Sequence, residues 1–226
     1  MTVPDEGMLL LVDKPKHWTS FDVVNKLRYA FKIKKIGHAG TLDPLAQGLL
    51  LIGVGKFTKK LELLQGLNKE YEGVIEIGKT TPSFDLETAF DSSSDYLHIT
   101  SAQVLEAAQQ LTGKLDQMPP IYSAIRVNGE RAYKSARKNE PLELKSRRIH
   151  IFEFEIIKIS LPEIYFRVTC SKGTYIRSLA KDFGEILGVG GYLKQLNRTK
   201  IGDYSLQHAQ QLETLIDQIK LAHEGN

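Results

Sequence analysis

A glycine-rich segment that ends in Asp43-Pro44 constrains this chain more than any other part of its sequence. Gly37 and Gly40 allow backbone conformations that other residues resist. Pro44 fixes its own φ and pushes Asp43 towards an extended conformation. The apolar run at residues 49–52 follows and is typical of a buried strand. The segment therefore predicts a stiff, turned loop that presents one carboxylate, although an ordinary turn capped by Asp has similar residues.

Apolar periodicity indicates both strands and helices in the rest of the chain. The apolar residues at helical spacing, which we expect to form the inner faces of the helices, include Phe21, Leu105 and Ile186. Strands are predicted at residues 8–12, 69–78, 148–159 and 164–170, and helices around residues 19–31, 57–64, 100–111, 171–186 and 212–219.

Composition restricts the class of protein. The chain has 226 residues, of which 42% are hydrophobic and 25% charged, which suits a globular protein built as one large domain or two small ones. No apolar run approaches the roughly 18 residues of a membrane span, and the N-terminus lacks signal-peptide features. The single cysteine, Cys170, cannot form an internal disulfide, and no zinc-ligand spacing is present. We therefore expect a cytoplasmic protein without a metal.

The charge of the chain is concentrated in two basic tracts. The net charge is only +3, but residues 14–35 hold seven Lys or Arg and one acid, and residues 131–148 hold seven and two. Such tracts indicate a polyanionic partner, although solvated helix faces give similar runs.

The second tract follows a segment in which Pro119-Pro120 interrupts regular structure and Tyr122 and Tyr133 lie among basic residues. Aromatic rings interleaved with cations suit single-stranded nucleic acid, because they offer stacking surfaces and phosphate partners. An ordinary surface hairpin is the alternative interpretation.

The segment around Asp43 closely resembles the catalytic motif of the TruB family of tRNA pseudouridine synthases. The family pattern is Gly-His-x-Gly-x-Leu-Asp-Pro-x-Ala-x-Gly, and residues 37–48 match every fixed position. Residues 12–20 resemble the family's first motif, with His17 in place of the usual glycine. Further motifs at residues 171–177 and 190–198 follow in the family's order.

The resemblance implies an α+β fold, with a mixed, mostly antiparallel sheet, flanking helices and an RNA-binding insertion around residues 117–147. It covers residues 7 to about 205, so we expect one catalytic domain over residues 1–226. Family members commonly add a C-terminal PUA domain, but about twenty residues after Tyr204 are too few for one. We therefore expect salt-sensitive tRNA binding that is dominated by the basic tracts.

The resemblance also implies a reaction. Pseudouridine formation breaks the bond between ribose C1′ and uracil N1, rotates the base and rejoins it through C5. A carboxylate can attack either C1′ or C6, and the choice stays open. With an ordinary pKa of about 3.9, Asp is ionised at pH 7 without a general base. The family assigns this role to Asp43, and the chemistry requires neither a metal nor a cofactor.

Other side chains take roles from the same resemblance. Arg177 pairs with Asp43 through its planar guanidinium. Tyr71 stacks on the target uracil, whereas a proton-transfer role suits it less, because an ordinary phenol has a pKa of about 10. His38 inserts into the RNA loop where the target base was. Tyr175 lies against the active site, provided that the chain is still extended at this residue. Leu196 forms an apolar wall under the base. The substrate is also contacted by Lys14, Arg126 and Arg198.

The implied substrate is uridine 55 in the T arm of tRNA, bound by a monomer. Two alternatives stay open: the same chemistry on another RNA, and an RNA-folding factor whose catalysis is incidental. Asp85 lies in a polar segment that matches a family pattern imperfectly, and no role is assigned to it.

Overall fold

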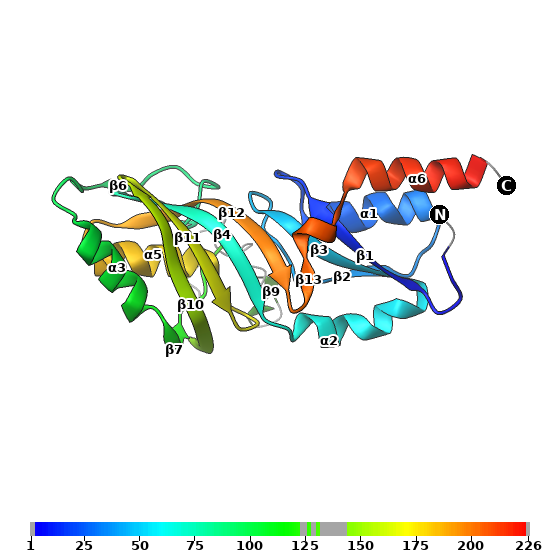
Figure 1. The fold of residues 1–226 in the computed structure, drawn as a ribbon, viewed down its shortest axis with the longest axis horizontal. Helices are drawn as coiled ribbons and strands as arrows, with labels where there is room; N and C mark the ends of the chain where they lie inside the picture. The colour runs from blue at the N-terminus through cyan, green and yellow to red at the C-terminus, as the bar shows by residue number, and fades with distance from the viewer. Residues whose placement is uncertain (1–2, 123–125, 128–129, 132–143, 225–226) are drawn as a thin grey trace. The chain divides into compact units, whose positions relative to one another are not determined.

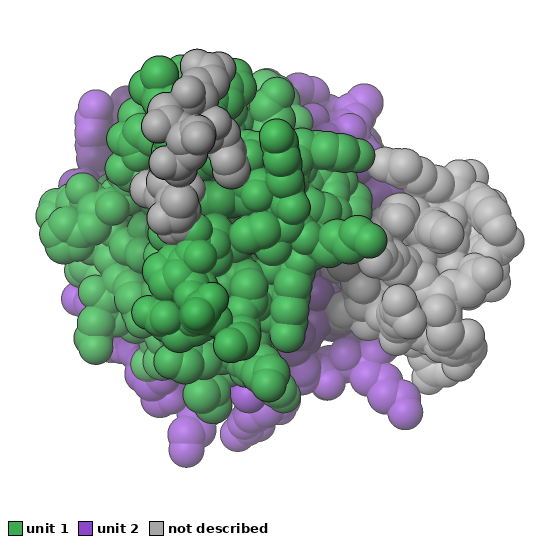
Figure 2. All heavy atoms as spheres, turned by 90° about the vertical axis from the view of Figure 1, so that its right-hand side faces the viewer, with its two compact units in different colours: residues 1–72, 196–226 green, residues 73–195 purple. Residues whose placement is uncertain are grey.

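The computed structural model describes residues 3–122, 126–127, 130–131 and 144–224 (Figure 1). The chain forms two compact units, one of residues 1–72 and 196–226 and the other of residues 73–195 (Figure 2). Most of the predicted insertion at residues 117–147 lies outside the described residues, and so does Tyr133. Among the described residues, no helix is long and apolar enough to cross a bilayer.

The first unit is built around β3, whose side chains are buried on both faces. β1 and β2 run antiparallel to β3, and the end of β12 pairs with its start in parallel. Leu50, Ile52 and Val54 belong to one core cluster, and Leu49 and Leu51 belong to another. The strands are β1 (Met8–Lys14), β2 (Ile36–Ala39), β3 (Gln47–Val54), β12 (Gly191–Ile201), β13 (Tyr204–Ser205) and β14 (Gln210–Gln211).

Helices cover the sheet of the first unit. α1 (Ser20–Phe31) begins at a capping box in which Thr19 and Asp22 exchange hydrogen bonds. Its inner face shares a core cluster with α6 (Leu212–Glu224). The 3₁₀ helices η1 (Gly55–Lys60) and η2 (Leu206–His208) and the short helix α2 (Leu61–Gln65) complete the unit.

The strands of the second unit are neighbours in the order β4, β11, β10, β7, and β10 runs antiparallel to both β11 and β7. β4 (Lys69–Ile77) and β12 each belong partly to both units. α3 (Ser101–Gln110) begins at a capping box of Thr100 and Gln103, and α5 (Ile176–Ile186) follows β11. The other strands are β5 (Lys79–Thr80), β6 (Ser92–Ser93), β7 (Gly113–Gln117), β8 (Arg126–Val127), β9 (Glu130–Arg131), β10 (Arg147–Ser160) and β11 (Glu163–Cys170).

The structure confirms the predicted α+β class, with a mixed, mostly antiparallel sheet and flanking helices. Three side chains differ from the prediction: Phe21, Leu105 and Ile186 are 60%, 54% and 40% exposed, because they lie outside the stripe of each helix that packs on the core. The expectation of one catalytic domain stays a prediction.

Candidate active site

The turn that carries Asp43 begins later than the sequence suggests. Ile36–Ala39 pair with β3, so Gly37 and His38 belong to a strand instead of a loop. An added Cβ on Gly37 would lie 3.2 Å from Leu61 Cδ1, a tight contact that a small shift of the leucine side chain would have to relieve. Gly40 has a φ of +84°, so it supplies the left-handed conformation that starts the turn.

Arg198 holds one side of this turn. Its guanidinium donates hydrogen bonds to the carbonyl oxygens of Leu49 (Nε, 2.8 Å), Gly40 (Nη2, 3.1 Å) and Thr41 (Nη1, 3.5 Å). The side chain is 1% exposed. Because three carbonyls of β3 and the turn share one rigid, planar donor, Arg198 fixes the turn against the strand that follows it.

Lys14 and Ser20 anchor the other side of the turn that carries Asp43. Lys14 Nζ donates to the carbonyls of Pro15 (2.9 Å), Trp18 (2.5 Å) and Pro44 (3.5 Å). Ser20 Oγ accepts from Leu42 N at 2.9 Å and donates to Leu42 O at 3.2 Å. The backbone on both sides of Asp43 is therefore anchored to β1 and α1.

His17 takes part in the same anchorage. Its backbone N–H donates to Pro44 O at 2.7 Å, and its φ is +69°. Non-glycine residues rarely adopt this left-handed conformation, although His is enriched among those that do. His17 therefore occupies a position whose backbone geometry glycine would adopt most easily.

Contact of Lys14 and Arg198 with the substrate stays a prediction. Both side chains are buried, and backbone carbonyls accept their hydrogen bonds. A cation that binds RNA phosphates must reach solvent, so direct contact with RNA phosphates does not fit either residue. We infer that both are positioning residues that hold the Asp43 turn.

The alkaline limb of the pH profile tests the role of Lys14. Burial lowers the pKa of its ammonium to about 8, because desolvation outweighs the attraction of the Asp43 carboxylate. Above that pH the group loses its charge and one of three N–H donors, so kcat/KM should fall as pH rises through 8 in a pseudouridine-formation assay. Lys14→Met should abolish this pH dependence, whereas Lys56→Met, at an exposed lysine, should keep it. An unchanged profile in Lys14→Met would show that another group titrates.

His38 is uncharged near neutral pH. Burial, followed by the positive charge of Arg198, lowers the pKa of the imidazole, and a hydrogen bond to the Gly40 backbone opposes this only in part. Its Nδ1 is buried and has no hydrogen-bond partner among the described residues. A neutral ring beside the turn suits stacking or insertion better than acid–base chemistry.

Tyr71 lies on β4 near the same turn. It shares a face of the strand with Lys69, since side chains alternate and both are buried. Lys69 Cε lies 3.9 Å from where a Cβ on Gly40 would be. The phenol ring is 8% exposed. Leu196, on β12, is half-buried and adjoins the residues that pair with the start of β3.

In the second unit, Arg177 lies on the first turn of α5 and is 3% exposed. Its Nε lies 3.7 Å from Asp85 Oδ2, and its Nη1 donates to Ser83 O at 3.3 Å. Asp85 is also buried, and its Oδ1 accepts from Glu87 N at 2.9 Å. The arrangement provides a desolvated guanidinium whose orientation is fixed by Asp85, a carboxylate to which the sequence analysis assigns no role.

The chain is still extended at Tyr175, which is the condition for the expected placement of this side chain. Its φ of −98° and ψ of 110° are extended, and the helix begins at the next residue. Gln117 fixes this backbone by donating to Tyr175 O (3.0 Å) and accepting from Tyr175 N (2.8 Å). The Arg147 guanidinium lies 4.5 Å from the centroid of the Tyr175 ring. The side chain of Arg126 lies outside the described part of the chain.

No cluster suggests a bound metal within the described ranges, where no group of three or more His, Cys, Asp or Glu side chains could hold an ion. The expected absence of a metal stays a prediction. What the site does offer is a braced aspartate turn flanked by a neutral imidazole and a buried phenol, and a separately braced arginine.

Comparison with known proteins gives consistent matches along the chain. The model of the TruB family pseudouridylate synthase N-terminal domain matches residues 28–176, and that of the tRNA pseudouridylate synthase B C-terminal domain matches residues 177–226. A protein named tRNA pseudouridine synthase B from Flavobacterium johnsoniae is 56% identical over 90% of this chain and 92% of its own length. The one from Chloroherpeton thalassium is 46% identical over 98% and 95%.

Solved structures support the fold. A chain of an archaeal box H/ACA sRNP Nop10–Cbf5 complex superimposes with a TM-score of 0.72 at 23% identity, and one of a Cbf5–Nop10–Gar1 complex with 0.74 at 25%. Each match covers 98% of this chain, which spans 56% and 57% of those longer chains.

Proposed function

The chain belongs to the TruB family of pseudouridylate synthases, and on that premise we propose that it converts uridine 55 in the T arm of tRNA to pseudouridine. The enzyme class is an isomerase that acts on RNA without adding or removing atoms. The observation that supports this most is the fully matched motif at residues 37–48, whose turn is braced from both sides.

In the proposed reaction, Asp43 attacks the flipped-out nucleotide at either C1′ or C6. The C1′–N1 bond breaks, the uracil rotates, and a C1′–C5 bond forms. The proton leaves C5 and N1 gains one, so atoms and charges balance and no redox partner is needed. A carboxylate that is ionised at neutral pH needs no activating base, which suits a site built around a single aspartate.

We propose that Arg177 pairs with Asp43 when RNA is bound, as the family resemblance implies. A planar guanidinium can contact two carboxylates through different edges. Asp85 and Ser83 occupy part of its donor set and fix its orientation. Asp85 is therefore a positioning residue for the arginine, and Tyr175, two residues before Arg177, adds an aromatic wall.

His38 is proposed to occupy the space that the target base leaves. Extrusion of a base from an RNA stack costs on the order of a few kcal/mol. An imidazole kept neutral by burial can stack in the vacated position without adding a charge. Leu196 would then provide an apolar surface under the flipped base.

Tyr71 gives a test that separates stacking from proton transfer. We expect Tyr71→Phe to keep measurable turnover, because the ring face is retained, whereas Tyr71→Leu should lose about tenfold or more in kcat/KM. Single-turnover tritium release from [5-³H]uridine-labelled tRNA measures both. If Tyr71→Phe is as inactive as the Leu variant, the hydroxyl is required and the stacking role alone is insufficient.

The substrate assignment is tested by mapping. Purified protein is incubated with unmodified tRNA and with an isolated T-arm stem-loop, and pseudouridine is located by carbodiimide modification and primer extension. We expect a single new pseudouridine at position 55 in both RNAs. Pseudouridine at another position, or none in the presence of active control enzyme, would overturn the substrate assignment.

A further inference from the structure

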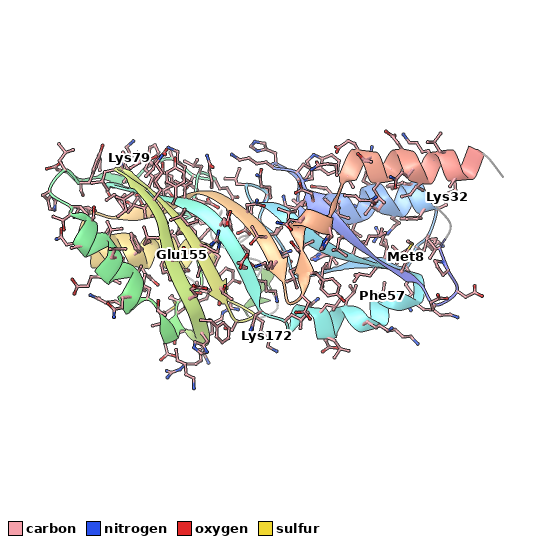
Figure 3. All side chains as sticks on the ribbon, in the orientation of Figure 1. Met8, Lys32, Phe57, Lys79, Glu155 and Lys172 are labelled. Atoms are coloured by element: carbon pink, nitrogen blue, oxygen red, sulfur yellow. The ribbon has the colours of Figure 1, made fainter. Side chains whose placement is uncertain are left out.

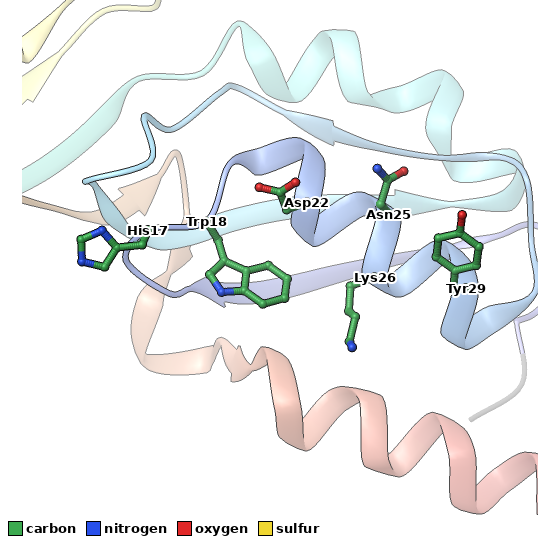
Figure 4. A pocket seen from close by; sticks show the side chains of 6 residues that line it. All are labelled: His17, Trp18, Asp22, Asn25, Lys26 and Tyr29. Atoms are coloured by element: carbon green, nitrogen blue, oxygen red, sulfur yellow. The ribbon is translucent and has the colours of Figure 1, made fainter. Parts of the chain in front are cut away.

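A pocket on the first unit lies beside the Asp43 turn and takes no part in the chemistry proposed above. Its volume is about 380 Å³, which falls in the usual range of about 300–1,000 Å³ for small-molecule sites. It is formed by the loop before α1 and the outer side of that helix (Figure 4). The lining residues are His17, Trp18, Asp22, Asn25, Lys26 and Tyr29.

Two aromatic rings give the pocket flat surfaces. Trp18 is partly buried and packs against the core cluster shared by α1 and α6, which holds its indole in place. Tyr29 is 81% exposed, an unusual position for so large a ring. Figure 4 shows both rings bordering the pocket, with the Lys26 side chain between them. A fixed ring and an accessible ring are what a stacking site for a planar ligand requires.

The surface around the pocket is strongly positive. Six cations on or next to α1 are exposed or half-exposed, and Asp22 is the single acid in this stretch. Among the described residues, none of the six forms an ion pair, and Lys32, the C-cap of α1 that is labelled in Figure 3, is exposed. The cations are Lys16, Lys26, Arg28, Lys32, Lys34 and Lys35. This charge favours a polyanion and disfavours a cationic ligand.

The pocket is joined to the proposed reaction site by hydrogen bonds. His17 N donates to Pro44 O at 2.7 Å, and Lys14 Nζ bridges Trp18 O and Pro44 O. The residues at one end of the pocket therefore hold the residue after Asp43. An RNA that places a uridine at Asp43 would have further nucleotides close to this surface.

We propose that the pocket binds an unpaired nucleotide of the RNA substrate other than the uridine that is isomerised. Trp18 stacks on its base, and Tyr29, roughly 16 Å further along α1, stacks on the base of the adjacent nucleotide. Lys26 contacts the phosphate between them, and Asp22 and Asn25 hydrogen-bond to polar groups on a base edge or a ribose. This inference rests on the proposed function and extends it from the reacting nucleotide to its RNA context. An unpaired nucleotide fits better than a duplex, because only an unstacked base exposes its faces to aromatic rings.

Trp18 provides a direct readout, because it is the only tryptophan of the chain. Titration of the protein with unmodified tRNA should change the Trp18 fluorescence in a saturable manner, with the same Kd as filter binding. Polyphosphate, which has charge but no bases, should leave the emission nearly unchanged. If polyphosphate changes the emission as tRNA does, or if tRNA leaves it unchanged although it binds, the proposed stacking is wrong.

Variants then measure the contribution of each side chain. Tyr29→Ala should weaken tRNA binding about tenfold and raise KM by a similar factor, because one stacking surface is lost. Tyr29→Phe should bind within about twofold of the wild type, whereas Lys26→Ala should reduce affinity and lower the salt dependence of binding. Leu63→Ala is the matched control, since Leu63 is 75% exposed on α2 of the same unit and distant in sequence from the pocket.

The outcomes separate the two proposals. If wild-type protein forms pseudouridine and Tyr29→Ala binds and reacts as the Leu63→Ala control does, the pocket proposal fails and the proposed function stands. If wild-type protein binds tRNA through Trp18 and Tyr29 but forms no pseudouridine, the proposed function fails while the nucleotide site stands.

Discussion

Replacing Asp43 by Asn is expected to reduce pseudouridine formation at least about a thousandfold, because the amide is a poor nucleophile and the reaction has no alternative group. RNA binding should persist, because the substitution keeps the size of the side chain. It also leaves in place the hydrogen bonds that Arg198 and Lys14 donate to neighbouring carbonyl oxygens. Single-turnover tritium release measures the reaction, and filter binding measures the affinity for tRNA.

The control for this substitution is Asp203→Asn, which removes a carboxylate from an exposed turn of the same unit. It should react like the wild type. Turnover by Asp43→Asn within about tenfold of the wild type would exclude Asp43 as the nucleophile. Loss of tRNA binding together with activity would instead indicate that the turn had changed shape, which circular dichroism and thermal unfolding would reveal.

Replacing Arg177 by Met is expected to remove activity and also to destabilise the protein. Both Arg177 and Asp85 are buried, so the substitution leaves a desolvated carboxylate without its cation. Loss of one partner of a buried pair typically costs about 3–5 kcal/mol. We expect a lower free energy of unfolding in urea and a large fall in kcat, measured by tritium release under conditions in which the variant is folded.

A double variant separates the two effects. Arg177→Met with Asp85→Leu removes both charges, so most of the lost stability should return while activity stays absent. Arg177→Lys should keep the charge but lose the planar fork, and should therefore remain well below the wild type in kcat. Full activity in the double variant would show that the arginine serves only to neutralise Asp85.

Much of the fold could be predicted because local signals agree with it. The helices that follow Thr19 and Thr100 occupy almost the predicted residues, and so does strand β4. The apolar run after Asp43 is buried on both faces, as a continuous run of this kind indicates. These features depend on neighbouring residues, which a sequence displays directly.

The contacts that the sequence could not provide are made between distant segments. The sequence does not reveal that Lys14 and Arg198 are buried against backbone carbonyls, because a cation in a sequence gives no sign of its surroundings. Asp85 approaches Arg177 only because two distant segments meet in the fold. His38 was placed in a loop, because the pairing of β2 with β3 depends on the register of a neighbouring strand.

The central claim is that Asp43 acts on a uridine flipped out of the T loop while Arg177 holds its carboxylate. A crystal structure with a T-arm stem-loop that carries 5-fluorouridine at position 55 tests it most directly. We predict that an Asp43 carboxylate oxygen lies within about 3.5 Å of C1′ or C6, or is bonded to one of them, with the Arg177 guanidinium within about 4 Å of the same carboxylate. A base that remains stacked in the loop, or an Asp43 side chain directed away from the nucleotide, would contradict the account.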